Sequence, residues 1–197
     1  MEGPRPTLRE RQRALRMEAI LDAAFALIVE KGFASVTLEQ IADVACVSKP
    51  TVYQYFRSKE DILVYLGIRC LDQVIDHFET LRPEMPARER LDRTLEAFIE
   101  FRLDEKIAQF IDLAQHVLPM KHGIDELSER EVALKDAFSQ LVREAQKERY
   151  VRDDLPPEFL CEVVIGLMKD PSRVWTRENK EDPDKLLRNL RVLLGIP

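Results

Sequence analysis

Apolar residues recur at intervals of three and four along nine stretches of the chain, which is the spacing of amphipathic α-helices. The expected helices span residues 8–31, 37–45, 48–56, 58–81, 91–99, 107–118, 128–150, 157–168 and 182–195. The chain has only six Gly and no run of β-branched residues, so a sheet is not expected. The pattern predicts an all-α fold of about nine helices, with a small three-helix domain first and a helical bundle after it.

Residues 37–56 carry the clearest local signals. Thr37 and Gln40 have the spacing of a capping box, which predicts the start of a short helix. Ser48 is placed to cap a second helix that has Pro50 in its first turn, where a missing N–H costs little. A helix, a tight turn and a second helix form a helix-turn-helix, an arrangement typical of DNA-binding proteins.

The same stretch resembles the DNA-binding segment of the tetracycline-repressor (TetR) family of bacterial transcriptional regulators. The resemblance covers roughly residues 17–66. The residues that carry it are Thr37, Ile41, Ala42, Val47, Ser48, Pro50, Thr51, Tyr53, Phe56, Ser58, Lys59 and Glu60. It implies that the second helix of the motif lies in the DNA major groove.

The resemblance also implies which side chains touch DNA. The residues expected at phosphates are Thr37, Tyr53 and Lys59. Those expected at the groove floor or its edges are Lys49, Thr51, Gln54 and Tyr55, and Ser48 and Pro50 complete the predicted DNA-binding set. Among them, Lys49 has a donor for guanine, and Gln54 has the donor and acceptor pattern that reads adenine.

A net charge of −6 is unusual for a DNA-binding protein, but it is unevenly distributed. Residues 1–69 hold ten Lys and Arg against nine Asp and Glu, a balance of +1, whereas residues 70–197 hold twenty against twenty-seven, a balance of −7. The first sixteen residues contain Arg5, Arg9, Arg11, Arg13 and Arg16. Residues 1–13 are therefore read as a basic, flexible N-terminal arm. Either it lies along DNA phosphates or in the minor groove, or it is a solvated tail that aids solubility.

We assign residues 14–74 to the DNA-binding domain and residues 75–197 to a helical regulatory and dimerisation domain. The helix over residues 58–81 carries two adjacent apolar stripes, which predicts that it connects the two domains. In the resembled family the second domain holds an internal pocket. A ligand in that pocket shifts this helix and changes the distance between the two DNA-binding domains of a dimer. The candidate pocket residues are Phe98, Phe101, Arg102, Phe110, Gln115, Met120, Phe138, Met168 and Trp175. Plain core packing is the alternative for each of them.

The expected partners are double-stranded DNA, a small-molecule effector and a second copy of the chain. The run from Val163 to Met168 is apolar nearly all round, which suits a helix covered on both sides in a four-helix interface. A homodimer through the last two helices would place its recognition helices about 34 Å apart and read a palindromic operator.

No residue pattern in the sequence indicates catalysis or metal binding. The residues tested were His77, His116, His122, Cys46, Cys70 and Cys161, which include no zinc-type pair and no C-x-x-C pair. The six Gly are scattered singly, so no phosphate-binding loop is expected. We therefore expect no enzyme, no cofactor and no metal. The chain has no signal core and no run of 18 apolar residues, so a bacterial cytoplasmic location without a membrane span is expected.

The sequence thus predicts a sequence-specific DNA-binding regulator, a repressor that leaves a palindromic operator when a small ligand binds the C-terminal domain. The alternative is a regulator without a small-molecule effector, controlled by a protein partner or by oxidation of Cys46. Cys46 stands in the turn where the resembled family usually has Gly. If the turn keeps its geometry, Cys46 should have a positive φ at a cost of about 1 kcal/mol.

Overall fold

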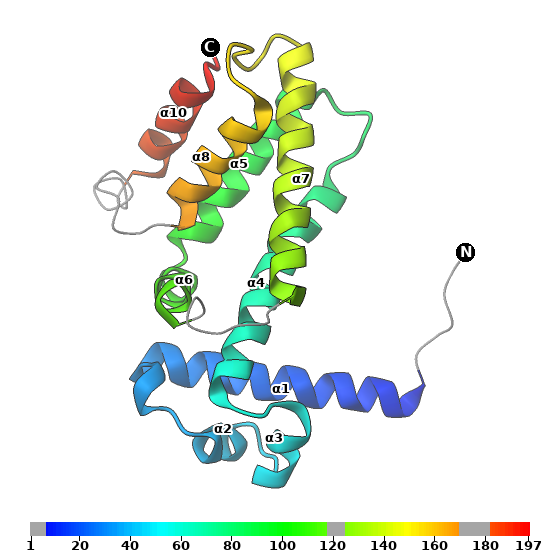
Figure 1. Cartoon of the computed structure of the whole chain (residues 1–197), viewed down its shortest axis with the longest axis vertical. Coiled ribbons are helices and arrows are strands. Elements are labelled where there is room, and N and C mark those ends of the chain that lie inside the picture. The colour runs from blue at the N-terminus through cyan, green and yellow to red at the C-terminus, as the bar shows by residue number, and fades with distance from the viewer. Residues whose placement is uncertain (1–6, 118–124, 170–181) are drawn as a thin grey trace.

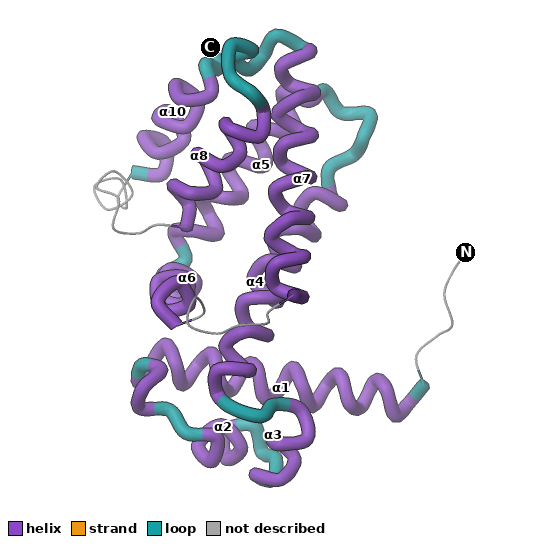
Figure 2. Tube along the Cα trace, viewed as in Figure 1, coloured by secondary structure: helices purple, strands orange, loops and turns teal. Residues whose placement is uncertain are grey.

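The fold is all-helical, as predicted. The computed structural model describes residues 7–117, 125–169 and 182–197, and these residues form nine α-helices and one short 3₁₀ helix with no strand (Figures 1 and 2). The elements are α1 (Leu8–Lys31), η1 (Phe33–Ser35), α2 (Leu38–Val44), α3 (Lys49–Tyr55), α4 (Lys59–Thr80), α5 (Ala87–Leu103), α6 (Glu105–Val117), α7 (Asp125–Lys147), α8 (Pro157–Lys169) and α10 (Pro183–Leu194).

The first layer of the molecule consists of α1, α2, α3 and the beginning of α4, with α1 lying across the other two short helices (Figure 1). Their apolar faces enclose one cluster of buried side chains, which we call the N-terminal core. Its members include Ile20, Leu21, Ala24, Leu27, Ile28, Val36, Ile41, Ala42, Val52, Phe56, Ile62, Leu63, Leu66 and Phe110. Burial of these apolar side chains stabilises α2 and α3, which are too short to be stable as isolated helices, against α1 and α4.

The second layer is a bundle of α5, α7, α8 and α10 around a separate cluster, the bundle core. Members of this cluster include Leu91, Leu95, Phe98, Leu134, Phe138, Val142, Leu160, Val164, Leu186 and Leu190. Helix α4 rises from the first layer into this bundle, and α6 lies between the bundle and α1 (Figure 1). Helix α4 packs against the N-terminal core up to Cys70 and against the bundle core from Leu71 onwards.

Helix α1 begins earlier than a flexible arm of thirteen residues would allow. A capping box at Thr7 starts it: the Glu10 amide donates to the Thr7 hydroxyl, and the Thr7 amide donates to the Glu10 carboxylate. Arg9, Arg11 and Arg13 are therefore helical, which confirms the helix expected over residues 8–31 and contradicts a flexible arm that extends to residue 13. The first half of α1 contributes no buried residue before Ile20, so this arginine-bearing segment extends as an exposed helix.

Three further helix boundaries show where local signals succeed and fail. Gly32 follows α1 with φ 77° and ψ 146°, a backbone region open mainly to Gly. Asp182 caps α10 by accepting from the Lys185 amide, and Gly195 ends the helix in the left-handed α conformation. Helix α7 begins at Asp125, so the helix start expected at residue 128 was too late in the chain.

Candidate nucleic-acid interface and cavity

Helices α2 and α3 form the predicted helix-turn-helix. The α2 capping box is present, with the Gln40 amide donating to the Thr37 hydroxyl over 3.2 Å. In the turn, Cys46 has φ 53°, which confirms the predicted positive φ at a non-Gly residue. The Val47 amide then donates to the Ala42 carbonyl over 3.0 Å. This short link fixes the angle at which α3 leaves the turn.

Helix α3 divides into a buried side and an exposed side. Val52 and Phe56 are 0% and 1% exposed and fix the helix against the N-terminal core. Tyr53, which is 51% exposed, and Gln54 point to solvent. Tyr55 is only half-buried because its ring packs on the N-terminal core, with the Arg13 guanidinium of α1 5.9 Å from its centroid. That contact brings an arginine of the exposed segment of α1 beside the recognition helix.

The Ser48 and Thr51 hydroxyls at the start of α3 form a hydrogen bond with each other. Ser48 caps the helix by accepting from the Thr51 amide, and the Ser48 and Thr51 hydroxyl oxygens are 2.7 Å apart. Pro50 lies in the first turn of α3, where it displaces no hydrogen bond. Ser48 and Pro50 therefore shape the helix start, which presents Thr51 at its N-terminal end.

Lys49 forms an ion pair with Glu39 of α2 across the outside of the motif. The hydrogen bond from Lys49 lowers the pKa of the Glu39 carboxyl below its usual value, and the same bond raises the pKa of the Lys49 ammonium. Both side chains remain about half exposed or more. A base-reading Lys49 must leave this carboxylate first.

The Lys59 side chain is directed into the protein, whereas the sequence analysis expected it at a DNA phosphate. Its ammonium donates to the carbonyl oxygens of Phe33, Ala34 and Val36 at 2.9, 3.2 and 3.3 Å, and it lies 4.6 Å from the centroid of the Phe33 ring. These bonds use its three donors and tie the start of α4 to the segment after α1. Any anion at this end of α4 would therefore meet the backbone N–H groups rather than a free ammonium.

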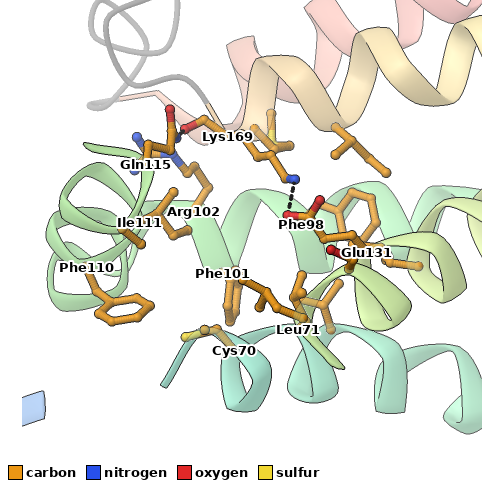
Figure 3. Close-up of a pocket in the computed structure, with 18 of the residues that line it drawn as sticks. Cys70, Leu71, Phe98, Phe101, Arg102, Phe110, Ile111, Gln115, Glu131 and Lys169 are labelled. Atoms are coloured by element: carbon orange, nitrogen blue, oxygen red, sulfur yellow. Dashed lines mark hydrogen bonds and ion pairs between the residues drawn. The ribbon is translucent and has the colours of Figure 1, made fainter. Parts of the chain in front are cut away.

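A cavity of about 750 Å³ lies where α4, α5, α6, α7 and α8 meet (Figure 3). Its walls are mostly apolar. The lining residues are Gly67, Cys70, Leu71, Val74, Phe98, Phe101, Arg102, Phe110, Ile111, Ala114, Gln115, Asp125, Leu127, Ser128, Glu131, Leu134, Ile165, Met168 and Lys169. A largely apolar hollow of this size with a few polar groups is what small-molecule sites look like.

Six of the nine predicted pocket residues line this one cavity: Phe98, Phe101, Arg102, Phe110, Gln115 and Met168. Phe138 does not, because it is fully buried in the bundle core with its ring 5.3 Å from that of Phe98. Met120 and Trp175 lie outside the described residues. Contact of these residues with a ligand stays a prediction.

Sequence reasoning missed the wall that α4 supplies. Gly67, Cys70, Leu71 and Val74 all face the cavity. Burial raises the pKa of the Cys70 thiol to about 11. The only available signal was the second apolar stripe of this helix, which did not show whether it met a core or a hollow.

Polar groups of the cavity gather where α5, α6 and α8 meet, and Glu131 adds a carboxylate from α7. The Arg102 guanidinium approaches the Asp112 carboxylate at 3.3 Å. The Gln115 side chain donates to the carbonyl of Lys169, and the Lys169 ammonium lies 2.8 Å from Glu131 (Figure 3). Phe101, Cys70 and Leu71 lie on the opposite, apolar side in the same view.

The described residues hold neither a metal site nor a membrane-spanning helix. No group of three or more His, Cys, Asp or Glu side chains in residues 7–117, 125–169 and 182–197 is arranged to hold a metal ion. Among the helices that the structure describes, none combines the length and the apolar character that a membrane crossing requires.

Comparison with known proteins gives consistent matches. Residues 20–66 match the family described as bacterial regulatory proteins, tetR family. The fatty acid metabolism regulator protein of Bacillus subtilis is 22% identical over 175 residues, covering 87% of this chain and 89% of that protein.

Among solved structures, the fatty acid degradation regulator FadR from Bacillus halodurans is 21% identical with a TM-score of 0.73, covering 98% of this chain and 96% of that one. FadR from Bacillus subtilis, solved in complex with stearoyl-CoA, is 20% identical with a TM-score of 0.67, covering 90% and 95%. Both share the fold of this chain from end to end. With its helix-turn-helix in the matched segment, the stretch over residues 20–66 is a DNA-binding domain of the tetR family of bacterial regulatory proteins, and the chain is a DNA-binding transcriptional regulator.

Proposed function

We propose that this regulator is a repressor that releases a palindromic operator when an apolar ligand fills the cavity between α4 and the bundle. The observation that carries the proposal is the position of that cavity. It is walled on one side by α4, the helix whose first turns belong to the N-terminal core. A ligand at this point acts on the element that carries the DNA-reading motif.

Phe110 supplies a second mechanical link. It is 2% exposed, lines the cavity from α6, and also belongs to the N-terminal core, where its ring is 5.8 Å from that of Phe25 on α1. A ligand that displaces Phe110 or α4 therefore has to repack the DNA-binding layer. Close-packed interiors transmit such shifts because they cannot absorb them locally.

For the ligand we propose a long-chain acyl compound. The apolar walls suit an aliphatic chain, and the polar side at α5, α6 and α8 suits a head group with oxygen acceptors. The structural relative from Bacillus subtilis was solved with stearoyl-CoA, which is a compound of this class. The presence of a formed cavity favours this control over one by a protein partner or by oxidation of Cys46.

Operator recognition is proposed to require a homodimer through α8 and α10. The side chains of Phe159 and Val192 on these helices are 53% and 75% exposed, although both are large and apolar. A two-fold dimer would present two copies of α3 to successive major grooves about 34 Å apart. We propose that Lys49, Thr51, Gln54 and Tyr55 face the bases.

The remaining predicted residues would hold the sugar–phosphate backbone or shape the motif. Tyr53 can donate its exposed hydroxyl to a phosphate, and the Arg13 guanidinium beside Tyr55 adds positive charge to the same face. Thr37 and Lys59 are proposed to act at phosphates through the helix starts that they stabilise, since their side chains already have partners in the protein.

Selection of bound duplexes from a random pool tests the DNA part of this proposal. The expected product is an inverted repeat with half-sites one helical turn apart, about 10 base pairs. Gln54→Ala should change the preferred bases, whereas Tyr53→Phe should weaken all sequences alike. An asymmetric single site would contradict the dimer, and an unchanged preference with Gln54→Ala would contradict base reading by that residue.

Thermal unfolding tests the ligand part. Stearoyl-CoA that binds the folded form raises the melting temperature as its concentration rises. No shift with stearoyl-CoA or stearate would contradict the proposed ligand class. A shift on oxidation of the protein that Cys46→Ala abolishes would support redox control in its place.

A further inference from the structure

The cavity contains a buried cation with an unused donor. Arg102, in the last turn of α5, is 9% exposed and lines the cavity. One of its terminal nitrogens, Nη2, approaches the Asp112 carboxylate at 3.3 Å, but its Nε is buried and has no hydrogen-bond partner. Buried donors are almost always satisfied, so an unsatisfied one in a cavity wall points to a partner that arrives with the ligand.

The neighbours of Arg102 define what that partner must be. Asp112 already offsets the guanidinium charge, and Gln115 uses its side-chain amide on the carbonyl of Lys169. Lys169 is itself paired with Glu131. Among the described lining residues, Arg102 is therefore the cation that has a buried N–H without a partner, and guanidinium groups bind oxygen acceptors in a fixed planar geometry.

We propose that Arg102 anchors the head group of the ligand, with its Nε–H donating to an oxygen that terminates or interrupts a long apolar chain. The inference rests on the proposed ligand-controlled function and specifies its chemistry. Phe101, Cys70 and Leu71, on the opposite side of the cavity, receive the chain (Figure 3). Carboxylates and thioesters both supply such an oxygen, so the shared feature is the acyl oxygen rather than the rest of the head group.

The test measures the affinity of the full-length protein for stearate and for stearoyl-CoA by isothermal titration calorimetry. Arg102→Met replaces the guanidinium with an apolar chain of similar length and should weaken acyl binding by about tenfold or more, since a hydrogen bond from a charged donor is lost. Arg93→Met is the matched control, because it makes the same change on the exposed face of α5, where Arg93 pairs with Glu89 away from the cavity lining. Its affinity should stay within about fivefold of wild type.

Arg102→Lys separates the donor from the charge. It keeps a cation beside Asp112 but has no Nε–H, so it should also bind acyl compounds more weakly while keeping the wild-type melting temperature. Arg102→Met should not melt far below wild type without ligand, because the residue it removes carries an unsatisfied donor. A purely structural arginine would show the reverse, with a lower melting temperature and an unchanged affinity for the ligand.

The two ligands separate the sources of the acyl oxygen. Equal weakening of stearate and stearoyl-CoA in Arg102→Met supports recognition of the oxygen they share, and weakening of stearate alone supports recognition of a carboxylate. Unchanged affinity for both in Arg102→Met or Arg102→Lys would overturn the role of Arg102 while leaving the proposed function intact. If wild-type protein binds neither compound, the proposed ligand class fails and this inference fails with it.

Discussion

At the scale of single residues, Cys46 is the position where the helix-turn-helix stores strain. It holds φ 53° with a side chain attached, which costs about 1 kcal/mol relative to Gly. Cys46→Gly should therefore raise the melting temperature by about 2–4 °C for a chain of this size. Cys46→Ala is the control, because it removes the thiol but keeps the Cβ and the strain. Thermal denaturation checks both, and equal stability of the two variants would show that the turn is unstrained.

Glu39 forms an ion pair with Lys49, one of the residues proposed to face the bases. Glu39→Gln removes the partner of the ion pair and an anion from the proposed DNA face, so operator affinity should rise several-fold at low salt and less at high salt. Anisotropy titrations at two salt concentrations measure this. Glu96→Gln, an exposed change on α5, should leave operator affinity unaltered. A drop in affinity with Glu39→Gln would mean that the pair positions Lys49 for the bases.

At the scale of elements, α4 is the helix that both layers share, and Cys70 reports on its cavity side. With a pKa of about 11, only about a thousandth of this thiol is ionised at pH 8, and the reactive thiolate increases about tenfold with each pH unit up to that pKa. Iodoacetamide should therefore modify Cys70 slowly and with this pH dependence, whereas the exposed Cys46 reacts first. Mass spectrometry of the modified peptides measures both rates.

Repeating the modification experiment with bound ligand provides its control. Saturating stearoyl-CoA should slow modification of Cys70 further, because the thiol lines the cavity, and should not change the rate at Cys46. If calorimetry shows that the protein has bound stearoyl-CoA but the modification rate of Cys70 does not change, the ligand lies outside this cavity.

Local signals made the helix-turn-helix predictable. The capping pairs at Thr37 and Ser48 and the Pro50 position lie within a few residues of each other, so sequence spacing and structure agree there. The bonds of Lys59 were not predictable, since its carbonyl partners lie 23 to 26 residues earlier in the chain. The Lys49–Glu39 pair was missed for the same reason, because it depends on the angle between α2 and α3.

The cavity was predictable only in part. Large side chains on α5, α6 and α8 indicated where a pocket could form, but size alone did not distinguish a core residue such as Phe138 from a lining residue such as Phe101. The difference arises from how α4 and α7 pack around them, which is a tertiary property. The capping box at Thr7 was readable from its Thr and Glu spacing, and it is the signal that would have shortened the expected arm.

At the scale of the whole molecule, two layers with separate cores meet along α4 and α6. Arg69 of α4 pairs with Asp22 of α1 at 2.6 Å, which ties α4 to the first layer next to this junction. The cavity lies beside this junction, so ligand binding can shift one layer relative to the other. Coupling between two sites is reciprocal, so the operator should weaken ligand binding by the same factor by which the ligand weakens operator binding.

A cavity-filling variant isolates this coupling. Ala114 lines the cavity from α6, and Ala114→Trp should fill it, so stearoyl-CoA should neither bind nor change operator affinity. Ala133→Trp makes the same change on the exposed face of α7 and should respond as wild type does. Calorimetry with stearoyl-CoA gives the binding result, and a filled variant that still responds to the ligand would move the effector site away from this cavity.

The dissociation constant for the selected operator, measured by anisotropy with and without saturating stearoyl-CoA, tests the central claim most directly. Ligand control through α4 predicts that the acyl compound raises this constant by about 5- to 150-fold, the usual range of coupling between two sites. An unchanged constant, in protein that calorimetry shows to be fully occupied by the ligand, would contradict it.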